Sequence, residues 1–576
     1  ILDAVTFDDS SASNAVYTTN LANATNNDLV FTAVATGATG ESVSVIFQDP
    51  FVSDSPLSVN VSGSAITVSL GTDALGLINS TASAVKAAIE ANTAASALVT
   101  VANSAANDGS GIVAGVFGNL SLANPAITIA TGITVSPGDM TFDHSAIDYS
   151  FSGAGVIGGG GNIVKNGTGT LSISNANTFT GGATLNQGKL RLGSNTALGS
   201  GVITLAGGQF SSDSTVARTI ANSFALNGTV ILSDATDNGA ITMNGAGTLT
   251  GNVVVSIPTA ATVNHYFAGS ISDGSGSFSL TKQGVGTLTL GAANSYDGGT
   301  SIVAGKISAG TATAFGTGSV SVSDGAQASL VAAGPFTNAF SIAGNGVAET
   351  AGTSGAIRLL GATVSGPITM VGDSKISAYG STGTLSGSIG ESGADYLLQL
   401  VNDNTTTGST ITVSGNNTYT GGTSIKGTIV KANHNNALGT GPVTIESNGT
   451  AAIITRLELG TDVVIENDIT INSTAQTDFR AVVHSYAGNL ATPSLAVVNG
   501  DVFIQALAGN GGHLASESLS ASVLCVMGAI NVTPGISPVI RVGTVELGGG
   551  GDYLALNHGE GTLKLAANNG INPAAI

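Results

Sequence analysis

The chain has 576 residues, of which 82 are glycine, 42% are hydrophobic and only 9% are charged. Its formal net charge of −20 disfavours binding to nucleic acid and to anionic lipid, because both are polyanions. So little charge could indicate disorder, but the hydrophobic content and the regular alternation of valine, isoleucine and leucine argue for a folded chain. We therefore expect a mostly β protein with a solvated, extracellular surface.

The chain starts at Ile1 with neither a methionine nor a basic, apolar targeting segment. This start predicts a mature secreted chain from which a signal peptide has been cleaved. No stretch reaches the roughly 18 to 20 uninterrupted apolar residues of a transmembrane helix, so we expect no membrane insertion. The single cysteine, Cys525, lies in an apolar run and is predicted to be a buried, unpaired thiol.

Residues 1–25 are predicted to be a lone strand followed by a polar linker. The opening ILDAVTF is mostly apolar, and the run that follows it is rich in serine, asparagine and threonine. A strand at the end of a chain often has no partner in its own chain, which leaves it free to pair with another copy. The apolar residues of this predicted subunit contact are Ile1, Leu2, Val5 and Phe7.

Residues 26–125 differ from the rest of the chain and are predicted to form a small α+β module. Five strands are expected, at residues 29–35, 43–48, 57–61, 65–70 and 98–102. Residues 81–96 are rich in alanine and follow a Ser80-Thr81 cap, which predicts a helix. Its apolar face would consist of Val85, Ala88 and Ile89. The patterns Asn-Asp-Leu-x-Phe-Thr-Ala from Asn27 and Asn-Asp-Gly-x-Gly from Asn107 resemble a module of surface and phage-fibre proteins, which implies a decorative or binding role.

From residue 126 to residue 576 the chain repeats itself, and we predict a β-solenoid. Short runs in which apolar and small polar residues alternate end at Gly, Asn or Gly-Gly, which is the period of strands. Three full copies of the repeat begin at Lys165, Lys282 and Ser409, and a partial copy begins at Gly559. The full copies lie about 120 residues apart, so each period holds about five or six coils and the region holds about 20 coils.

Each full copy carries the same ordered pattern of residues. An asparagine is followed by an aromatic residue and a pair of glycines, and fifteen residues later by Ala-Leu/Phe-Gly-Ser/Thr-Gly. We expect asparagine and glycine to form equivalent sharp turns with positive φ, and the aromatic ring to stack on the coil beneath it. The matched positions are Asn177, Phe179, Gly181 and Gly182 in the first copy, Asn294, Tyr296, Gly298 and Gly299 in the second, and Asn417, Tyr419, Gly421 and Gly422 in the third.

These residues resemble the autotransporter-associated β-strand repeat, which is also called the passenger-associated transport repeat. Its pattern is roughly Gly-Thr-Leu-x-Leu, then Asn-Thr-Tyr-Thr-Gly-Gly-Thr, then Ala-Leu-Gly-x-Gly. The resemblance covers three full copies and one partial copy, with the sub-motifs in the same order. It implies an all-β fold, a right-handed parallel β-helix, and a location at the cell surface, and it implies no catalytic residue.

We expect no enzymatic activity, no metal site and no cofactor. Acid–base catalysis on polysaccharides needs clustered carboxylates, and the carboxylates here are scattered, without a recurring partner at the coil period. The six histidines lack metal-ligand spacing, and the glycine runs at 158–161 and 548–551 lack the Lys-Ser/Thr of a phosphate loop. The carboxylates nearest to candidates are Asp234, Asp237, Asp395, Asp403 and Asp552.

The leading functional hypothesis is a secreted structural protein that forms a cell-surface filament or layer, with copies of itself as partners. The alternative is a monomeric β-helical adhesin that binds surface glycans or neighbouring cells. A carbohydrate-active enzyme is the third hypothesis, and it would need a cleft with paired carboxylates. Small polar outer faces favour the first hypothesis, whereas a cluster of exposed aromatic residues would favour the second.

Head-to-tail assembly is the most specific form of the leading hypothesis. The end coils of a solenoid expose backbone N–H and C=O groups, and the fourth copy breaks off at Ile576, before its aromatic residue and glycine pair. Residues 1–7 could add as a strand to such an open edge in a neighbouring copy, and a contact of this type that does not close gives a filament. A natural chain that continues beyond Ile576 remains open as an alternative explanation.

Overall fold

The computed structural model contains two compact units, residues 1–214 and residues 215–576. The described residues are 26–36, 43–104, 107–113, 126–145, 148–258, 263–349, 352–402, 404, 406–446, 455–460 and 463–472. Outside these ranges the structure describes only the backbone of strands, within residues 5–8, 14–18 and 481–566. In the part of the chain that is described, no helix is long and apolar enough to cross a membrane.

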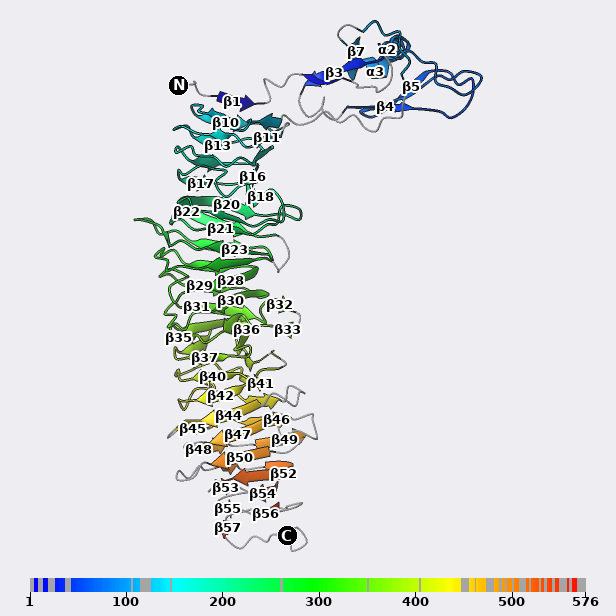
Figure 1. Ribbon diagram of the computed structural model, residues 1–576. Helices are drawn as coiled ribbons and strands as arrows, with labels where there is room; N and C mark the ends of the chain where they lie inside the picture. Colours follow the sequence, from blue (N-terminus) through cyan, green and yellow to red (C-terminus); the bar gives the residue numbers. More distant parts are fainter. Residues whose placement is uncertain are drawn as a thin grey trace. The chain divides into compact units, whose positions relative to one another are not determined.

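The first unit contains a module of two three-stranded sheets and two helices (Figure 1). One sheet is antiparallel with the order β2-β3-β7, and the other has the order β4-β6-β5, in which β4 runs parallel to β6. Each of the five predicted strands is present, with both ends within one residue of the expected position. These five strands are β3 (Leu29–Thr36), β4 (Ser44–Gln48), β5 (Ser58–Ser62), β6 (Ala65–Ser69) and β7 (Val99–Asn103). A sixth strand, β2 (Asn14–Thr18), lies in the stretch predicted to be a polar linker and pairs with β3.

The predicted single helix is wrong in its length, because the segment forms two helices, α2 (Ala82–Ala91) and α3 (Thr93–Ser96). Thr81 caps α2 as expected, by accepting the Ala84 N–H at 3.2 Å. The backbone of Asn92 is extended and not helical, and its Oδ1 accepts the N–H groups of Ala94 at 3.1 Å and Ala95 at 3.0 Å. An asparagine that caps a second helix in this way necessarily ends the first one.

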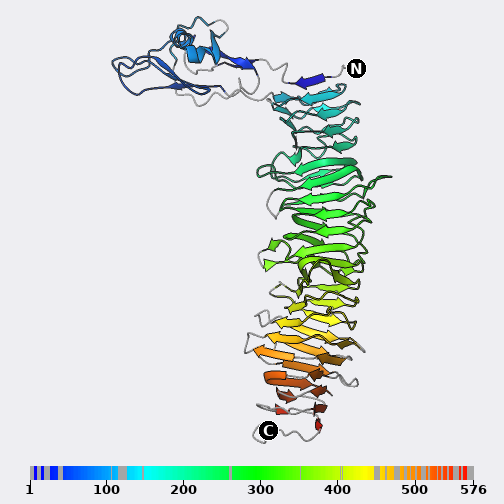
Figure 2. The same ribbon diagram turned by 180° about the vertical axis from the view of Figure 1, so that it is seen from behind.

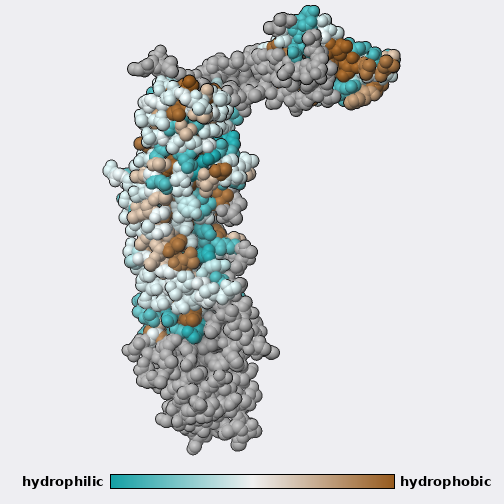
Figure 3. Space-filling model, viewed as in Figure 1, coloured by the Kyte–Doolittle hydropathy of each residue, from teal (hydrophilic) through white to brown (hydrophobic). Residues whose placement is uncertain are grey.

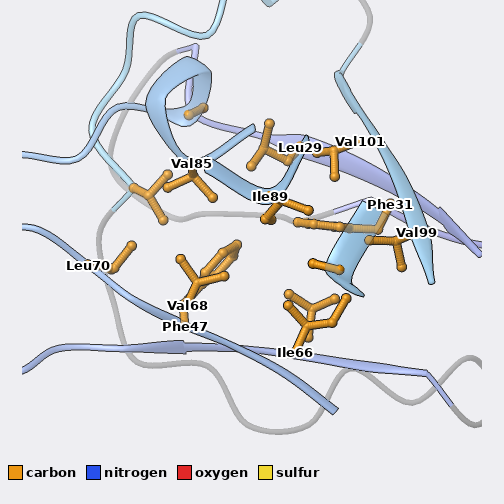
Figure 4. Packing of buried hydrophobic residues seen from close by; sticks show 14 of the residues in the cluster. Leu29, Phe31, Phe47, Ile66, Val68, Leu70, Val85, Ile89, Val99 and Val101 are labelled. Atoms are coloured by element: carbon orange, nitrogen blue, oxygen red, sulfur yellow. The ribbon is translucent and has the colours of Figure 1, made fainter. Parts of the chain in front are cut away.

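The core of the module lies between the two sheets and α2 (Figure 4). The rings of Phe31 on β3 and Phe47 on β4 lie 6.1 Å apart and join the two sheets. On the predicted helix face, Val85 and Ile89 are fully buried, whereas Ala88 is only partly buried. Each fully buried side chain of this size contributes about 1.5–3 kcal/mol, so the module has a core of its own.

Strand β1 (Val5–Asp8) pairs in parallel with β10 (Met140–Asp143), with Val5 opposite Met140 and Phe7 opposite Phe142. Figure 1 shows β1 directly against β10, although the module separates the two strands in sequence. The expectation that the opening strand has no partner in its own chain is therefore wrong. A local pattern gives no information about a partner so distant in sequence. Ile1 and Leu2 lie outside the described residues.

Residues 126–214 form stacked coils whose strands pair in parallel along two ladders (Figure 2). Ile163, Ala183 and Ile203 lie opposite one another, so one coil advances the sequence by 20 residues. The first ladder contains β10, β13 (Ile163–Lys165), β15 (Ala183–Leu185) and β17 (Ile203–Leu205). The second ladder contains β8 (Ala126–Thr128), β11 (Tyr149–Ser152), β14 (Thr170–Ile173), β16 (Lys189–Leu192) and β18 (Gln209–Ser212).

Residues 215–576 are built in the same way, and Thr300, Val320 and Phe340 again lie opposite one another. Parallel pairing continues in the strand backbone to β57 (Thr562–Ala566), which contains the start of the fourth copy. The chain is thus a parallel β-solenoid of about 18 turns, as predicted. The strands around the second and third copies are β20 (Phe224–Leu232), β21 (Ile241–Met243), β22 (Gly247–Ser256), β23 (Asn264–Phe267), β25 (Leu280–Gln283), β26 (Thr287–Leu290), β27 (Thr300–Ile302), β28 (Gly305–Ala309), β29 (Val320–Val322), β30 (Ala326–Leu330), β31 (Phe340–Gly344), β36 (Ile368–Ser377), β39 (Leu398–Val401), β40 (Thr410–Val413), β41 (Thr423–Lys426), β42 (Ile429–Ala432), β43 (Val443–Glu446), β44 (Thr455–Leu459) and β46 (Ile469–Asn472).

The coils bury alternate side chains, because successive residues of a strand point to opposite faces. In β15, for example, Ala183 and Leu185 are buried and Thr184 between them is partly exposed. Neighbouring coils satisfy most backbone polar groups through the ladders, so the outer face needs few charges. This is the structural reason for the low charge content of the sequence.

Candidate functional site

The three repeat asparagines each join three successive coils. In every copy the Oδ1 atom accepts a backbone N–H from the preceding coil, and the Nδ2 atom donates to a carbonyl of the following coil. The three side chains are at most 6% exposed, so water does not compete for these bonds. The contacts are Asn177 with Ile157 (2.9 Å) and Ala197 (2.7 Å), Asn294 with Ile271 (2.7 Å) and Ala314 (2.5 Å), and Asn417 with Ile389 (2.7 Å) and Ala437 (2.6 Å).

The three positions are equivalent in the structure, but the reason assigned to them from sequence is wrong. A turn residue with positive φ was expected, and in the described residues only Asn26, Phe51, Asp54 and Ser233 combine positive φ with a side chain. The repeat asparagines are used instead because an amide carries a donor and an acceptor on neighbouring atoms. One buried side chain can therefore bond both adjacent coils.

The two glycines of each pair are required for different reasons. A Cβ atom on the first glycine would meet backbone of the preceding coil, for example at 2.5 Å from the Gly161 carbonyl oxygen for Gly181. The second glycine has positive φ, as predicted, with values of 98° at Gly182, 90° at Gly299 and 96° at Gly422. Only glycine meets both demands without strain.

The three repeat aromatic residues, Phe179, Tyr296 and Tyr419, are completely buried. A glycine of the next coil lies on each ring, and a Cβ atom on that glycine would stand 3.0 Å from Phe179 Cγ and 3.1 Å from Tyr296 Cδ2. These glycines belong to the Ala-Leu/Phe-Gly sub-motif, one coil later in sequence. The fifteen-residue spacing therefore brings the two halves of the repeat into contact in adjacent coils. The glycines are Gly199, Gly316 and Gly439.

The tyrosine copies hold a hydroxyl pair that the phenylalanine copy lacks. Tyr296 Oη lies 2.8 Å from Thr300 Oγ1, and Thr300 donates its single proton to the Phe315 carbonyl at 3.1 Å. The tyrosine must therefore be the donor to the threonine, and burial raises the pKa of Tyr296. Tyr419 and Thr423 form the same pair at 2.7 Å. The first copy has Phe179 and Ala183 at these two positions, so both polar groups are absent together.

Sequence reasoning missed a further asparagine, one coil beyond the Ala-Leu/Phe-Gly sub-motif. Asn338 Nδ2 donates to the carbonyls of Gly316 at 3.1 Å and Gly318 at 2.7 Å. Asn467 does the same to Gly439 at 3.1 Å and Gly441 at 2.6 Å. The signal was available as an asparagine two residues before the first apolar residue of the next strand, in Asn-Ala-Phe and Asn-Asp-Ile.

A second missed feature is the lysine that opens the first two copies. Lys282 is fully buried, and its Nζ donates to the carbonyls of Gln283 at 2.8 Å, Gly284 at 2.7 Å and Ala304 at 3.3 Å. The bond to Ala304 reaches the next coil. Burial lowers the pKa of Lys282 to about 7. Lys165 is buried at the matching position and donates to the Gly167 carbonyl, so these lysines are structural.

The structure also brings together a serine and a histidine that resemble a nucleophile pair. Ser233 is buried with a φ of 69°, and its Oγ lies 3.1 Å from His265 Nε2. His265 Nδ1 accepts the Ile241 N–H at 3.0 Å, so the proton of the neutral ring sits on Nε2 and points at the serine. A general base needs Nε2 free to take the serine proton. Burial and the charge of Lys282 lower the pKa of His265 to about 4, and the pair serves as a structural bond between coils.

The candidate carboxylates have ordinary structural roles where they are described. Asp234 Oδ1 accepts the Thr236 and Asp237 N–H groups of its own turn at 2.9 and 2.8 Å. Asp395 Oδ1 and Glu391 Oε1 lie 2.7 and 2.6 Å from the Thr420 hydroxyl. Burial raises the pKa of Glu391, but hydrogen bonds from Thr420 and neighbouring backbone outweigh it and hold the pKa below its usual value. A carboxyl held ionised in this way is unsuited to act as a general acid.

The other candidates give no site among the residues that the structure describes. No group of three or more His, Cys, Asp or Glu side chains is arranged to hold a metal ion there. His144 and His265 are buried, and His434 Nδ1 accepts the Asn436 N–H at 3.0 Å. The remaining candidates, whose side chains lie outside the described residues, are Asp403, His484, His513, Cys525, Asp552 and His558.

Comparison with known proteins agrees with this geometry. The model of the family described as passenger-associated-transport-repeat matches residues 163–192, 280–309 and 408–427, and each range contains the asparagine, the aromatic residue and the glycine pair of one copy. The chain thus carries three passenger-associated transport repeats. It is 31% identical over 198 residues to the adhesin BmaC autotransporter of Brucella suis biovar 1 (strain 1330), and the match covers 33% of this chain and 5% of that relative. The chain therefore spans a small part of the length of this relative.

No solved structure matches the chain. The repeats and the partial likeness to an autotransporter imply that the chain is extracellular or displayed at the cell surface. The matched ranges include β13 to β16 and β25 to β28, and the asparagine, the aromatic residue and the glycine pair lie in the connections between β14 and β15 and between β26 and β27. The matched ranges therefore include the asparagines that join successive coils.

Proposed function

We propose that the chain is a non-enzymatic adhesin of the cell surface, in which the solenoid is a rigid scaffold and the module is the contact domain. The observation that carries this proposal is the asparagine lock, in which one buried side chain bonds three successive coils. Such bonds resist local opening of the stack. The likeness to an autotransporter adhesin over part of the chain supports the same function, and secretion through a cleaved signal peptide belongs to it.

Adhesion is tested with the full chain coupled to fluorescent beads. We expect the beads to be retained under flow on cell layers that carry surface glycans, and expect loss of retention when residues 14–125 are deleted. Circular dichroism of the deleted chain must still show the β spectrum of the solenoid, which serves as the control. Equal retention without the module would refute its role as the contact domain.

The absence of enzymatic activity belongs to the same proposal. The protonated Nε2 of His265 faces Ser233 and cannot take the serine proton, and Glu391 is held ionised and is unsuited to act as a general acid. The test is a polysaccharide panel assayed for released reducing or unsaturated sugars. Release that disappears with Glu391→Gln would overturn this part of the proposal.

A head-to-tail filament is the second candidate function, because β10 already accepts β1 in parallel pairing. The module separates these strands in sequence, so β1 is a discrete element that two copies could exchange. Since β1 pairs within its own chain, assembly would require exchange of this strand and not addition of a free one. Ile1, Leu2, Val5 and Phe7 remain the proposed contact residues.

Deletion of residues 1–13 tests the filament. We expect the full chain to form larger species in light scattering and negative-stain images, and expect the deleted chain to remain smaller. If both chains assemble equally, exchange of β1 is wrong. If the full chain stays monomeric at high concentration, the filament is wrong and the adhesin function is unaffected.

A further inference from the structure

Four large apolar side chains are exposed together on the module. They lie in the loops that follow β4 and β6, and they form a surface that we name the tip patch. One end of the module is correspondingly hydrophobic in Figure 3. The members of the tip patch are Phe51 (82% exposed), Val52 (59%), Leu75 (83%) and Leu77 (62%).

The two loops are held side by side by the fold and by hydrogen bonds. Because β4 and β6 are parallel neighbours with Gln48 opposite Ser69, both loops leave the sheet at the same end of the strands. Asp54 N–H donates to the Asp73 carbonyl at 2.9 Å, and the Ser55 N–H donates to Thr72 Oγ1 at 3.0 Å. The tip patch is therefore a fixed platform.

The backbone of the first loop is strained in a way that exposes Phe51. Its φ is 51°, in the left-handed region that a bulky side chain rarely adopts, and Asp54, three residues later, has a φ of 55°. Glycine or asparagine would occupy these positions without strain. A strained residue that places an aromatic ring in water does nothing for stability, so the strain indicates a function for the ring.

Carboxylates surround the tip patch. Asp49 accepts the Phe51 N–H at 2.8 Å, and Asp73 accepts the Leu75 and Leu77 N–H groups at 2.9 Å each, so both carboxylates lie next to the backbone of the patch residues. Within residues 26–113 the single basic residue is Lys86, which forms an ion pair with Glu90 at 2.7 Å. A second copy of the module, or an anionic membrane, would meet like charge here.

We propose that the tip patch docks a positively charged protein segment whose apolar side chains cover Phe51 and Leu75 while its lysines or arginines face the surrounding aspartates. An apolar centre with a charged rim is the usual anatomy of a protein contact, and an exposed patch of this kind marks an interaction site. A glycan is the less favoured occupant, because three of the four exposed side chains are aliphatic and offer no ring for a sugar to stack on. The inference rests on the adhesin function and names its contact surface.

The test measures binding of a synthetic amphipathic leucine–lysine peptide to the full chain by fluorescence anisotropy, with a leucine–glutamate peptide as the charge control. We expect only the basic peptide to bind, and expect Phe51→Asn to weaken it by about tenfold or more. Asn is compatible with the left-handed φ, so the melting temperature should stay equal or rise. Asp54→Asn should weaken binding less and reduce its salt dependence. Val34→Thr, at a site on β3 that is 47% exposed, is the matched control and should change nothing.

Several outcomes would overturn the inference. They are equal binding of both peptides, unchanged binding by Phe51→Asn, a melting temperature lowered by Phe51→Asn, and preferential binding of phosphatidylcholine vesicles or of a polysaccharide. The bead assay separates this inference from the adhesin function. If Phe51→Asn beads adhere as well as unmodified beads, the tip patch is wrong and adhesion stands. If unmodified beads fail to adhere, the adhesin function fails while the peptide titration still decides the patch.

Discussion

Replacement of Asn294 by alanine tests the asparagine lock most directly. The side chain is 6% exposed, accepts the Ile271 N–H at 2.7 Å and donates to the Ala314 carbonyl at 2.5 Å. Asn294→Ala removes both bonds and leaves two backbone groups buried without partners. Each such group costs about 1–3 kcal/mol, so we expect a local loss of about 2–6 kcal/mol.

The assay is hydrogen exchange at Ile271, because its N–H is itself one of the two bonded groups. Protection there should fall by at least about tenfold, with smaller effects in distant coils. The matched control is Asn186→Ala, which removes an exposed asparagine whose Nδ2 bonds Asn166 Oδ1 at 2.8 Å, and which should have little effect. Equal loss of protection in the two variants, or unchanged exchange at Ile271, would refute the lock.

Three further changes test other parts of the repeat. Burial lowers the pKa of His265 from 6.5 to about 4, so the folded state binds fewer protons than the unfolded state between these pH values. The free energy of unfolding should therefore fall by about 3 kcal/mol as the pH drops through that range, and His265→Asn should remove this acid sensitivity in melting curves. Phe179→Tyr should lose about 1–3 kcal/mol by burying an unpaired hydroxyl, and adding Ala183→Thr should restore part of the loss in a double-mutant cycle. Gly181→Ala should lower the melting temperature because its Cβ would meet backbone at 2.5 Å, whereas Gly160→Ala, with open space around it, should not.

The strands were predictable because their signal is local. Alternation of apolar and polar residues over a few positions fixes which side chains are buried, as in the buried Ala183 and Leu185 on either side of Thr184. The break in the predicted helix was also signalled locally, since Asn92 precedes a short alanine-rich turn that it can cap. The alanine-rich composition of residues 81–96 favours one continuous helix, but the Asn92 cap divides it.

The functions of the buried polar residues were not predictable from their own neighbourhood. Asparagine is a common residue in turns, but the hydrogen-bond partners of Asn177 lie 20 residues away on either side, at Ile157 and Ala197. Once one coil is known to take 20 residues, the spacing between Asn177 and the Ala-Leu-Gly sub-motif indicates contact between adjacent coils. The pairing of β1 with β10 has no such signal, because the intervening module conceals any regular spacing.

The lock extends over more coils than the one that contains the asparagine. A solenoid is a one-dimensional stack whose stability is a sum of contacts between neighbours, so one weak interface would let it open. In the second copy Asn294 bonds the coils before and after its own, and Asn338 then holds Gly316 and Gly318 from the coil beyond. Four successive coils are thereby joined by side-chain bonds, and opening any interface among them breaks a buried bond. Coils between the copies carry other buried bonds of this kind, such as that of His265 Nδ1 with the Ile241 N–H and that of Gln327 Nε2 with the Gly355 carbonyl.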